Sequence, residues 1–308
     1  MSGMKEHFYS SPWLDRAEAR RDDSDWLAAS LANTLTRIVP VWQQHSLVRM
    51  GDPVVSIEIA LGDLGTPPDA DDLFFLGLDA EGLACFSLAL TDAGDASAEV
   101  AATTGGEFMD LRRVGGLLDA QAAGLLAYAR AVTHWHDTHR FCGACGTATS
   151  VRRAGWLRVC PNSDCGRQHF PRTDPAVIMC VTHGDRVLLG RQAAWPENWY
   201  SVLAGFVEPG ESLEEAVRRE VEEEAGIRVG EVRYDSSQPW PFPASLMVGF
   251  SAIAEDDAIE LASDELEDAR WFSRAEIRDR VGKGALRLSP KQSISRHLLD
   301  LWLEGGGA

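Results

Sequence analysis

The chain has little positive charge for its size. Its 308 residues include 29 Lys or Arg against 47 Asp or Glu, a formal net charge of −18 at pH 7. Broad, sequence-independent binding of nucleic acid requires a basic surface, so this composition argues against it. A phosphate-bearing ligand would have to be bound locally, through metal ions, backbone amides or a few arginines.

Long apolar runs are also absent from the sequence. No stretch reaches the roughly 18 uninterrupted apolar residues that a membrane span requires. Residues 1–13 mix charged and aromatic side chains, and they lack the apolar segment and cleavage site of a signal peptide. We therefore expect a cytoplasmic protein with no membrane partner.

Cysteine is scarce and unevenly placed. Four of the six cysteines lie between Cys142 and Cys165, whereas Cys85 and Cys180 stand alone. A secreted framework of disulfides would be shorter and denser in cysteine. The pattern predicts one metal cluster.

The first half of the chain predicts a helical segment followed by a β-rich lobe. Residues 23–38 place apolar side chains near helical spacing. Short apolar runs at 54–61 and 73–78, separated by Asp, Gly and Pro, are typical of strands. A long helix is expected over 117–134, leading into the cysteine cluster.

The second half predicts an α+β domain with a strongly charged helix after a glycine-rich turn. Residues 182–185 have the composition of a hairpin turn between two strands. The expected strands are 176–181, 186–189, 230–234, 246–253 and 269–272, and the last helix is expected at 290–303.

The clustered cysteines form two pairs, one with two and one with four intervening residues. Four soft ligands on two knuckles suit tetrahedral Zn²⁺, and a fully occupied shell indicates a structural ion, one per chain. A redox pair or a catalytic thiol is the alternative, but no thioredoxin-like unit surrounds them. The predicted zinc ligands are Cys142, Cys145, Cys160 and Cys165. We expect the nearby His134, His136 and His139 to form a solvated helix end, and His169 to be structural.

The charged helix carries acidic residues where apolar ones belong. Ser212 and Glu215 form a capping box, and Gly226 suits the end, so the helix is predicted over 213–225. At about 100° per residue, Glu220 and Glu224 fall within the buried stripe and Glu223 beside it.

Three carboxylates on a buried face require positive compensation. We expect Arg219 to pair with one of them but not with all three. Hard divalent cations, Mg²⁺ or Mn²⁺, are the natural partners of the rest and would also bind a phosphate. The alternative is an acid-rich surface helix with no site, which the helical positions disfavour.

This segment resembles the Nudix box, G-x5-E-x7-R-E-U-x-E-E-x-G-U with U apolar, at every fixed position from Gly205 to Ile227. The resemblance implies a Nudix α/β/α sandwich with a mixed sheet. It implies that Glu220, Glu223 and Glu224 hold two or three divalent ions, with Glu223 and Glu224 catalytic and the carbonyl of Ala204 a further ligand. Glu211 and Arg219 would stabilise the loop of the motif.

A second motif resembles the SQPWPFPxS array of NADH pyrophosphatases. Its prolines would fix an extended loop outside the strand ladder, so that aromatic rings stack on a substrate base and polar groups donate hydrogen bonds. Filling of the core by the same rings is the alternative. The predicted substrate contacts are Gln238, Pro239, Trp240, Pro241, Phe242, Pro243, Ala244 and Ser245.

Three further positions match this family. Glu265 stands where its downstream metal-binding glutamate lies, Phe170 where an aromatic residue stacks on substrate, and Ser295 where the backbone contacts substrate. This sequence departs from the family at two places. Gly155 replaces a polar side chain that some relatives place near the substrate, and the second cysteine pair is two residues longer. The resemblance covers residues 137–303.

The resemblance implies three domains: an N-terminal α+β domain (1–136), a zinc ribbon (137–171) and a Nudix catalytic domain (172–308). It implies hydrolysis of NADH or NAD to AMP and nicotinamide mononucleotide, and a homodimer. Because the scissile bond is identical, the same chemistry would also remove NAD caps from the 5′ ends of RNA. The alternatives are a Nudix hydrolase of ADP-ribose, FAD, coenzyme A or a dinucleoside polyphosphate, and a non-catalytic nucleotide sensor whose ribbon binds nucleic acid.

Overall fold

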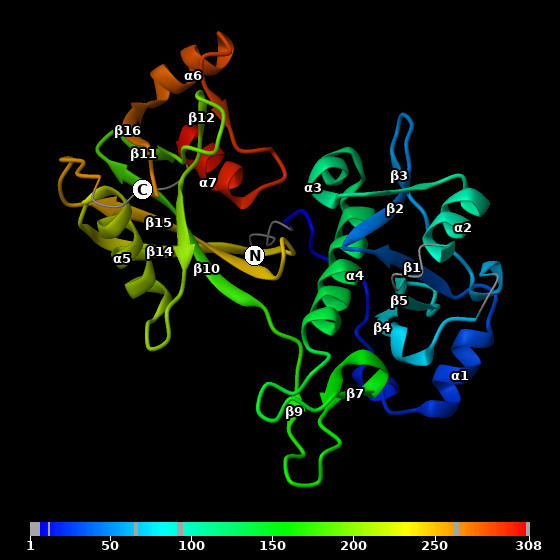
Figure 1. Cartoon of the computed structure of the whole chain (residues 1–308). Helices are drawn as coiled ribbons and strands as arrows, with labels where there is room; N and C mark the ends of the chain where they lie inside the picture. Colours follow the sequence, from blue (N-terminus) through cyan, green and yellow to red (C-terminus); the bar gives the residue numbers. More distant parts are fainter. Residues whose placement is uncertain (1–6, 12, 65–66, 91–94, 262–264, 306–308) are drawn as a thin grey trace. The chain divides into compact units, whose positions relative to one another are not determined.

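The computed structural model describes residues 7–11, 13–64, 67–90, 95–261 and 265–305. These residues form two compact units, each with its own core. The N-terminal unit consists of residues 8–173 together with 240–244, and the C-terminal unit contains residues 174–239 and 245–308 (Figure 1). Most of residues 1–13, over which no signal peptide was predicted, lie outside the described part. No described helix has the length and apolar character needed to cross a membrane.

The N-terminal unit is built on a mixed sheet with strand order β3-β2-β1-β5-β4, and β6 pairs with β2. Strands β1 and β5 run parallel in the middle of the sheet. Buried side chains alternate between its two faces, and helix α4 packs on one of them. Its strands are β1 (Arg37–Trp42), β2 (His45–Arg49), β3 (Val55–Ser56), β4 (Leu73–Leu78), β5 (Ala84–Leu90) and β6 (Glu107–Met109), and its helices are α1 (Ser24–Ala32), α2 (Asp95–Thr104), α3 (Leu111–Val114) and α4 (Ala120–Thr138).

The ribbon belongs to this unit and consists of a small antiparallel sheet of β7 (Ser150–Arg152), β8 (Leu157–Val159) and β9 (Gln168–His169). The β-rich character predicted for the first lobe is confirmed, but two of its boundaries were wrong. The helix predicted to reach residue 38 ends at Ala32, and Ile38 lies in β1. The run at 54–61 forms only the two-residue strand β3 and a single bridge at Ile59.

The C-terminal unit is a three-layer sandwich. Its sheet has the order β14-β15-β10-β11-β16, β13 pairs with β10, and the parallel pair β10–β15 makes the sheet mixed. Helix α5 packs on one face, and α6 and α7 cover the other. Its strands are β10 (Asp174–His183), β11 (Arg186–Arg191), β12 (Trp199–Tyr200), β13 (Leu203–Phe206), β14 (Val229–Trp240), β15 (Ser245–Ala254), β16 (Asp268–Ser273) and β17 (Arg287–Leu288), and its helices are α5 (Leu213–Ala225), α6 (Arg274–Gly282) and α7 (Ile294–Leu303).

The predicted hairpin and the α/β/α arrangement are confirmed, with His183 paired to Arg186 across the turn. The last helix begins four residues later than predicted, because Ser293 caps it by accepting a hydrogen bond from the amide of Arg296. The proline–aromatic array is not wholly outside the strand ladder, since β14 extends to Trp240. β14 is an edge strand, where a proline such as Pro239 is tolerated.

Candidate active site and zinc site

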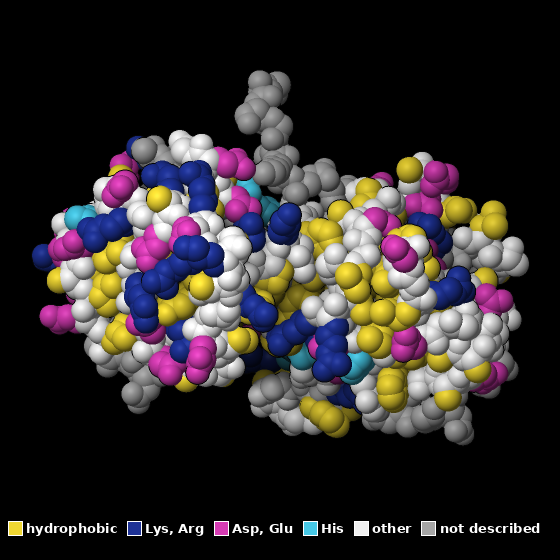
Figure 2. All heavy atoms as spheres, turned by 90° about the horizontal axis from the view of Figure 1, so that it is seen from above, with side chains coloured by type: hydrophobic (Ala, Val, Ile, Leu, Met, Phe, Trp, Pro, Cys, Tyr) yellow, Lys and Arg dark blue, Asp and Glu magenta, His cyan; other side chains and the backbone are white. Residues whose placement is uncertain are grey.

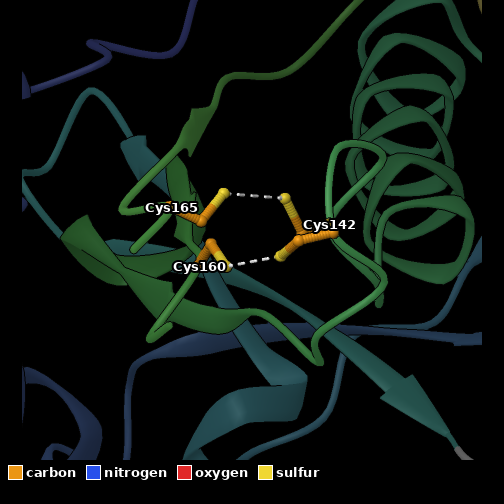
Figure 3. Close-up of side chains that lie close together, drawn as sticks. Cys142, Cys160 and Cys165 are labelled. Atoms are coloured by element: carbon orange, nitrogen blue, oxygen red, sulfur yellow. Dashed lines mark hydrogen bonds between the residues drawn. The ribbon is translucent and has the colours of Figure 1, made fainter. Parts of the chain in front are cut away.

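The four clustered cysteines bring their sulfur atoms together. All four Sγ atoms lie within 4.8 Å of one another. The Sγ–Sγ distance is 3.7 Å between Cys142 and Cys165 and 3.4 Å between Cys145 and Cys160 (Figure 3). Tetrahedral Zn²⁺ with Zn–S bonds of about 2.3 Å separates its sulfurs by about 3.8 Å. The longer second pair is therefore compatible with a four-cysteine zinc site.

The prediction of a solvated helix end was wrong for His136. Its ring is buried, stacks on Phe74 at 3.6 Å and lies within hydrogen-bonding distance of the carbonyl of Gly155. The reason is that α4 continues to Thr138 and packs against the sheet. Gly155 itself has φ 97° and a Cβ there would lie 2.8 Å from Phe74, so the departure from the family at this position has a packing reason.

Helix α5 spans the residues that its local signals predict. The hydroxyl of Ser212 accepts from the amide of Glu215, and the Glu215 carboxylate accepts from the amide of Ser212. Gly226 ends the helix with φ 71°, in the left-handed region that glycine tolerates. These caps fix which residues of the helix face the sheet.

The structure confirms the unusual placement of the acids on this helix. Glu220 is 8% exposed and Glu224 is 4% exposed, among the apolar side chains that pack on the sheet. Glu223 lies at the edge of this face, with 59% of its side chain exposed. The other helix charges, at positions 214, 215, 218 and 222, are exposed.

Arg219 organises the approach to these acids. Its guanidinium donates to both carboxylate oxygens of Glu211, to Glu220 Oε1 at 2.9 Å and to Glu223 Oε2 at 2.9 Å. It also donates to the carbonyl of Phe206. Its hydrogen bonds with Glu211 lower the pKa of that carboxyl to about 2. Arg219 thus pairs with two of the three helix acids rather than one, because its planar fork carries five donors.

Gly205 provides the space that the Glu220 carboxylate occupies. A Cβ at this position would lie 1.9 Å from Cδ of Glu220. Glycine is therefore the residue that lets β13 approach the helix acids so closely.

Glu224 retains an unsatisfied polar atom. Its Oε2 is buried and has no hydrogen-bond partner among the residues that the structure describes. Burial, with the nearby charges of Glu220 and Glu265, raises the pKa of Glu224 to about 8. A buried, unpaired carboxylate oxygen is costly, and a hard divalent cation is the partner that this donor set fits.

A pocket of about 910 Å³ opens beside the helix acids, within the C-terminal unit. It brings together five predicted site residues, whereas Glu224 is buried and is not among the residues that line it. The predicted residues that line it are Ala204, Glu220, Glu223, Ser245 and Glu265.

Sequence reasoning did not single out several other residues of this pocket. Phe206 lines it with a side chain that is 60% exposed, and Gln192 and Met247 also contribute to its wall. Phe206 carried a usable signal, because a large aromatic residue directly follows the first glycine of the Nudix box. Gln192 and Met247 are brought there by sheet pairing, which no local pattern reveals.

The other predicted substrate contacts have diverse positions. Gln238 is buried, donates to the carbonyl of Gln292 at 2.7 Å and accepts from the amide of Ile294 at 2.7 Å. Ser295 is buried and hydrogen-bonded to Ser201 and Ser289. Phe170 is exposed.

The tip of the β14–β15 hairpin belongs to the N-terminal unit. Phe242 is 6% exposed there, and its ring lies 5.6 Å from that of Tyr9 and 5.1 Å from that of Trp240. Arg112 donates to the carbonyl of Phe242. In this structure the two aromatic rings therefore fill the core, and their contact with a substrate stays a prediction.

Comparison with known families assigns the cysteine cluster and the domain of the acidic helix to one group of proteins. Residues 172–292 match the NUDIX domain, residues 137–170 the NADH pyrophosphatase zinc ribbon domain, and residues 35–135 the NADH pyrophosphatase-like rudimentary NUDIX domain. The last match agrees with a similarity between the two sheets. In each sheet one central strand, β1 or β10, pairs in parallel with one neighbour and forms an antiparallel hairpin with the next strand along the chain. Where the C-terminal sheet has α5, the described residues of the N-terminal unit form two short 3₁₀ turns, Leu61–Asp63 and Ala70–Asp72.

Relatives resemble the chain over nearly its whole length. The NAD-capped RNA hydrolase NudC of Mycobacterium bovis is 38% identical over 98% of both chains. The NAD-capped RNA hydrolase NUDT12 of Homo sapiens is 35% identical over 97% of this chain and 73% of its own length. The chain belongs to the Nudix hydrolase family, in the group that carries the NADH pyrophosphatase zinc ribbon.

Proposed function

We propose that the protein hydrolyses the diphosphate of NADH or NAD, releasing AMP and nicotinamide mononucleotide, and that it also removes NAD caps from the 5′ ends of RNA. The observation that carries this proposal is the buried Glu220–Glu224 pair, with its unsatisfied oxygen, beside a pocket of about 910 Å³. The printed names of the relatives supply the substrate class.

We propose that Glu220, Glu223, Glu224, Glu265 and the carbonyl of Ala204 hold two or three Mg²⁺ or Mn²⁺ ions. Such ions neutralise phosphate charge and lower the pKa of a bound water. Glu220 and Glu224 are fixed by burial, whereas Glu223 is exposed enough to reach a water or a phosphate. Arg219 positions Glu220 and Glu223 through its two hydrogen bonds.

Around this centre, the exposed ring of Phe206 is suited to stack on a base of the dinucleotide. Gln238 positions the start of α7 through its hydrogen bonds to the backbone on either side of Ser293. Phe170, Ser295 and the array from Gln238 to Ser245 remain proposed substrate contacts.

The proposal also covers the role of the zinc ion, the oligomeric state, the location and the domain division. We propose that the zinc ion is structural, because four cysteines leave no open position for a substrate. We also propose a homodimer, a cytoplasmic location and a division into domains 1–136, 137–171 and 172–308. Six free cysteines agree with a reducing compartment.

The direct test is incubation of the purified protein with NADH and Mg²⁺, with chromatographic identification of the products. AMP and the reduced mononucleotide are expected, and an unchanged dinucleotide would refute the proposal. Glu224→Gln should lower kcat by at least about 100-fold, the scale of losing one group that stabilises transition-state charge. Glu222→Gln, on the exposed face of the same helix, is the matched control and should retain full activity.

A further inference from the structure

The C-terminal part of the chain reverses the charge of the whole. Between residues 270 and 296 there are eight Lys or Arg and two acidic residues, in a chain with a net charge of −18. These residues extend from β16 through α6 and β17 to the start of α7, with Lys283 and Lys291 on the connections between elements. Dark blue Lys and Arg side chains gather on this face of the C-terminal unit in Figure 2, where Figure 1 shows α6 and α7.

Half of these cations form no ion pair with a carboxylate in the described part of the chain. Four of them form ion pairs, namely Arg270, Arg280, Lys283 and Arg296. Arg274 and Arg278 donate to backbone carbonyls at the end of α7 instead. Arg287 and Lys291 are exposed, and neither forms an ion pair with any residue that the structure describes. We call Arg287 and Lys291 the basic face.

Arg287 and Lys291 lie on the segment from β17 to α7, and β17 pairs with β12, the strand that precedes the pocket strand β13. Lys291 is on the connection from β17 to α7, which Gln238 holds through the carbonyl of Gln292. The start of α7 is fixed on the pocket side by the 2.8 Å contact between Ser295 and Ser201, three residues before the pocket residue Ala204. At about 3.3 Å per residue, Ser201 lies within about 10 Å of Ala204. Ser289, which stands two residues after Arg287 and two before Lys291, donates to the Ser201 hydroxyl at 3.2 Å. The backbone of both cations is therefore within roughly 25 Å of the pocket wall.

The chemistry of the two substrates differs only outside the pocket. NADH ends at its adenosine, whereas in NAD-capped RNA the strand continues from that adenosine with one phosphate per nucleotide. Cations within the pocket would act on both substrates. Cations on the adjacent surface would contact the phosphates of the RNA alone, in proportion to the counterions that they release.

We infer that the basic face binds the first phosphates of the RNA strand that follows an NAD cap seated in the pocket. This inference rests on the proposed function and adds to it the path of the RNA. It also accounts for RNA as a substrate of an acidic protein, because the attraction is confined to one side of one unit.

The test compares the wild type with the double variant Arg287→Gln/Lys291→Gln on two substrates, NADH and an NAD-capped RNA of about ten nucleotides. We expect kcat/KM for the capped RNA to fall about tenfold at low salt, with kcat/KM for NADH unchanged. The plot of log kcat/KM against log salt concentration for the RNA should become shallower by about 1.4, since each contact to a single strand contributes about 0.7.

The matched control is Arg228→Gln/Arg233→Gln, which removes two exposed charges from the start of β14 in the same unit. An equal loss in this control, an unchanged RNA rate in the first variant, or an equal loss on NADH would each overturn the inference. Wild-type protein that cleaves NADH but not capped RNA would also overturn it while leaving dinucleotide hydrolysis standing. Failure of the wild type on both substrates would refute the proposed function itself.

Discussion

Gly205 shows how a single missing side chain shapes the site. The Glu220 carboxylate occupies the position of its absent Cβ. In Gly205→Ala the carboxylate must move by more than 1 Å, and a displacement of this size costs about 100-fold in rate. We expect kcat to fall by about this factor, with weaker Mg²⁺ binding in a calorimetric titration.

Gly282→Ala is the control for that substitution. Gly282 lies at the end of α6, its φ is not positive, and a Cβ there meets nothing within 4 Å. This variant should keep both the rate and the stability of the wild type. Equal rates in the two alanine variants would show that the space beside Glu220 is not required.

His136 makes the stability of the N-terminal unit depend on pH. Burial lowers its pKa from 6.5 to about 3, and Arg158 Nη1 lies 2.9 Å from its Nδ1. The unfolded state therefore binds more protons than the folded state between these two values. The unfolding free energy is highest above pH 6.5 and falls as the pH drops towards 3, by about 2 kcal/mol at pH 5.

Urea unfolding at pH 7 and pH 5 measures this loss, with His136→Gln as the reference because glutamine does not titrate. The wild type should lose about 2 kcal/mol more than the variant between the two pH values. Identical losses would mean that His136 is protonated without penalty in the folded protein.

At the scale of elements, α5 was the most predictable part of the chain. The Ser212–Glu215 capping box and Gly226 are local signals, and the structure reproduces both. The burial of Glu220 and Glu224 follows from the helical repeat alone. The exposure of Glu223 and the position of Phe206 depend on how β13 meets the helix, which is a tertiary feature.

Two mispredictions have equally physical causes. Leu35 and Ile38 continue the apolar spacing of α1, but the chain turns after Ala32 and Ile38 joins β1, which pairs with β5 almost fifty residues away. Pro239 suggested a loop, but an edge strand needs no donor on its outer side. In both cases long-range strand pairing overrode the local pattern.

Arg219→Lys tests the element as a unit. Lysine keeps the charge but loses the fork that joins Glu211, Glu220 and Glu223. We expect a loss of about 2 kcal/mol in unfolding free energy, the value of hydrogen bonds to charged groups, together with reduced activity on NADH. Arg218→Lys, on the exposed side of the same helix, should change neither quantity in urea unfolding and steady-state assays.

At the scale of the whole molecule, the two units should respond differently to zinc removal. The four cysteines belong to the N-terminal unit, whereas the acidic helix and its pocket belong to the other. A chelator that strips zinc should lower the melting temperature of the N-terminal unit in calorimetry, and added Zn²⁺ should restore it. A melting profile that is the same with and without zinc would contradict a structural role for the ion.

The averaged charge of the molecule misled in one respect. A net charge of −18 argues against nucleic-acid binding, but it does not describe the stretch from Arg270 to Arg296. Charge is distributed by fold as well as by composition, so a strongly acidic chain retains a locally positive surface. The local excess of Lys and Arg is visible in the sequence, but which of these cations lack an ion pair is shown only by the structure.

Because the hairpin tip at residues 240–244 belongs to the N-terminal unit, a single break in the chain does not separate the two units cleanly. Severing the chain near Thr173 would leave this peptide attached to a fragment that cannot shelter its rings. The remaining piece would carry a hole beside Tyr9 where Phe242 had been. A gene rearrangement that transfers the C-terminal unit without the N-terminal unit must therefore also replace the hairpin tip at residues 240–244.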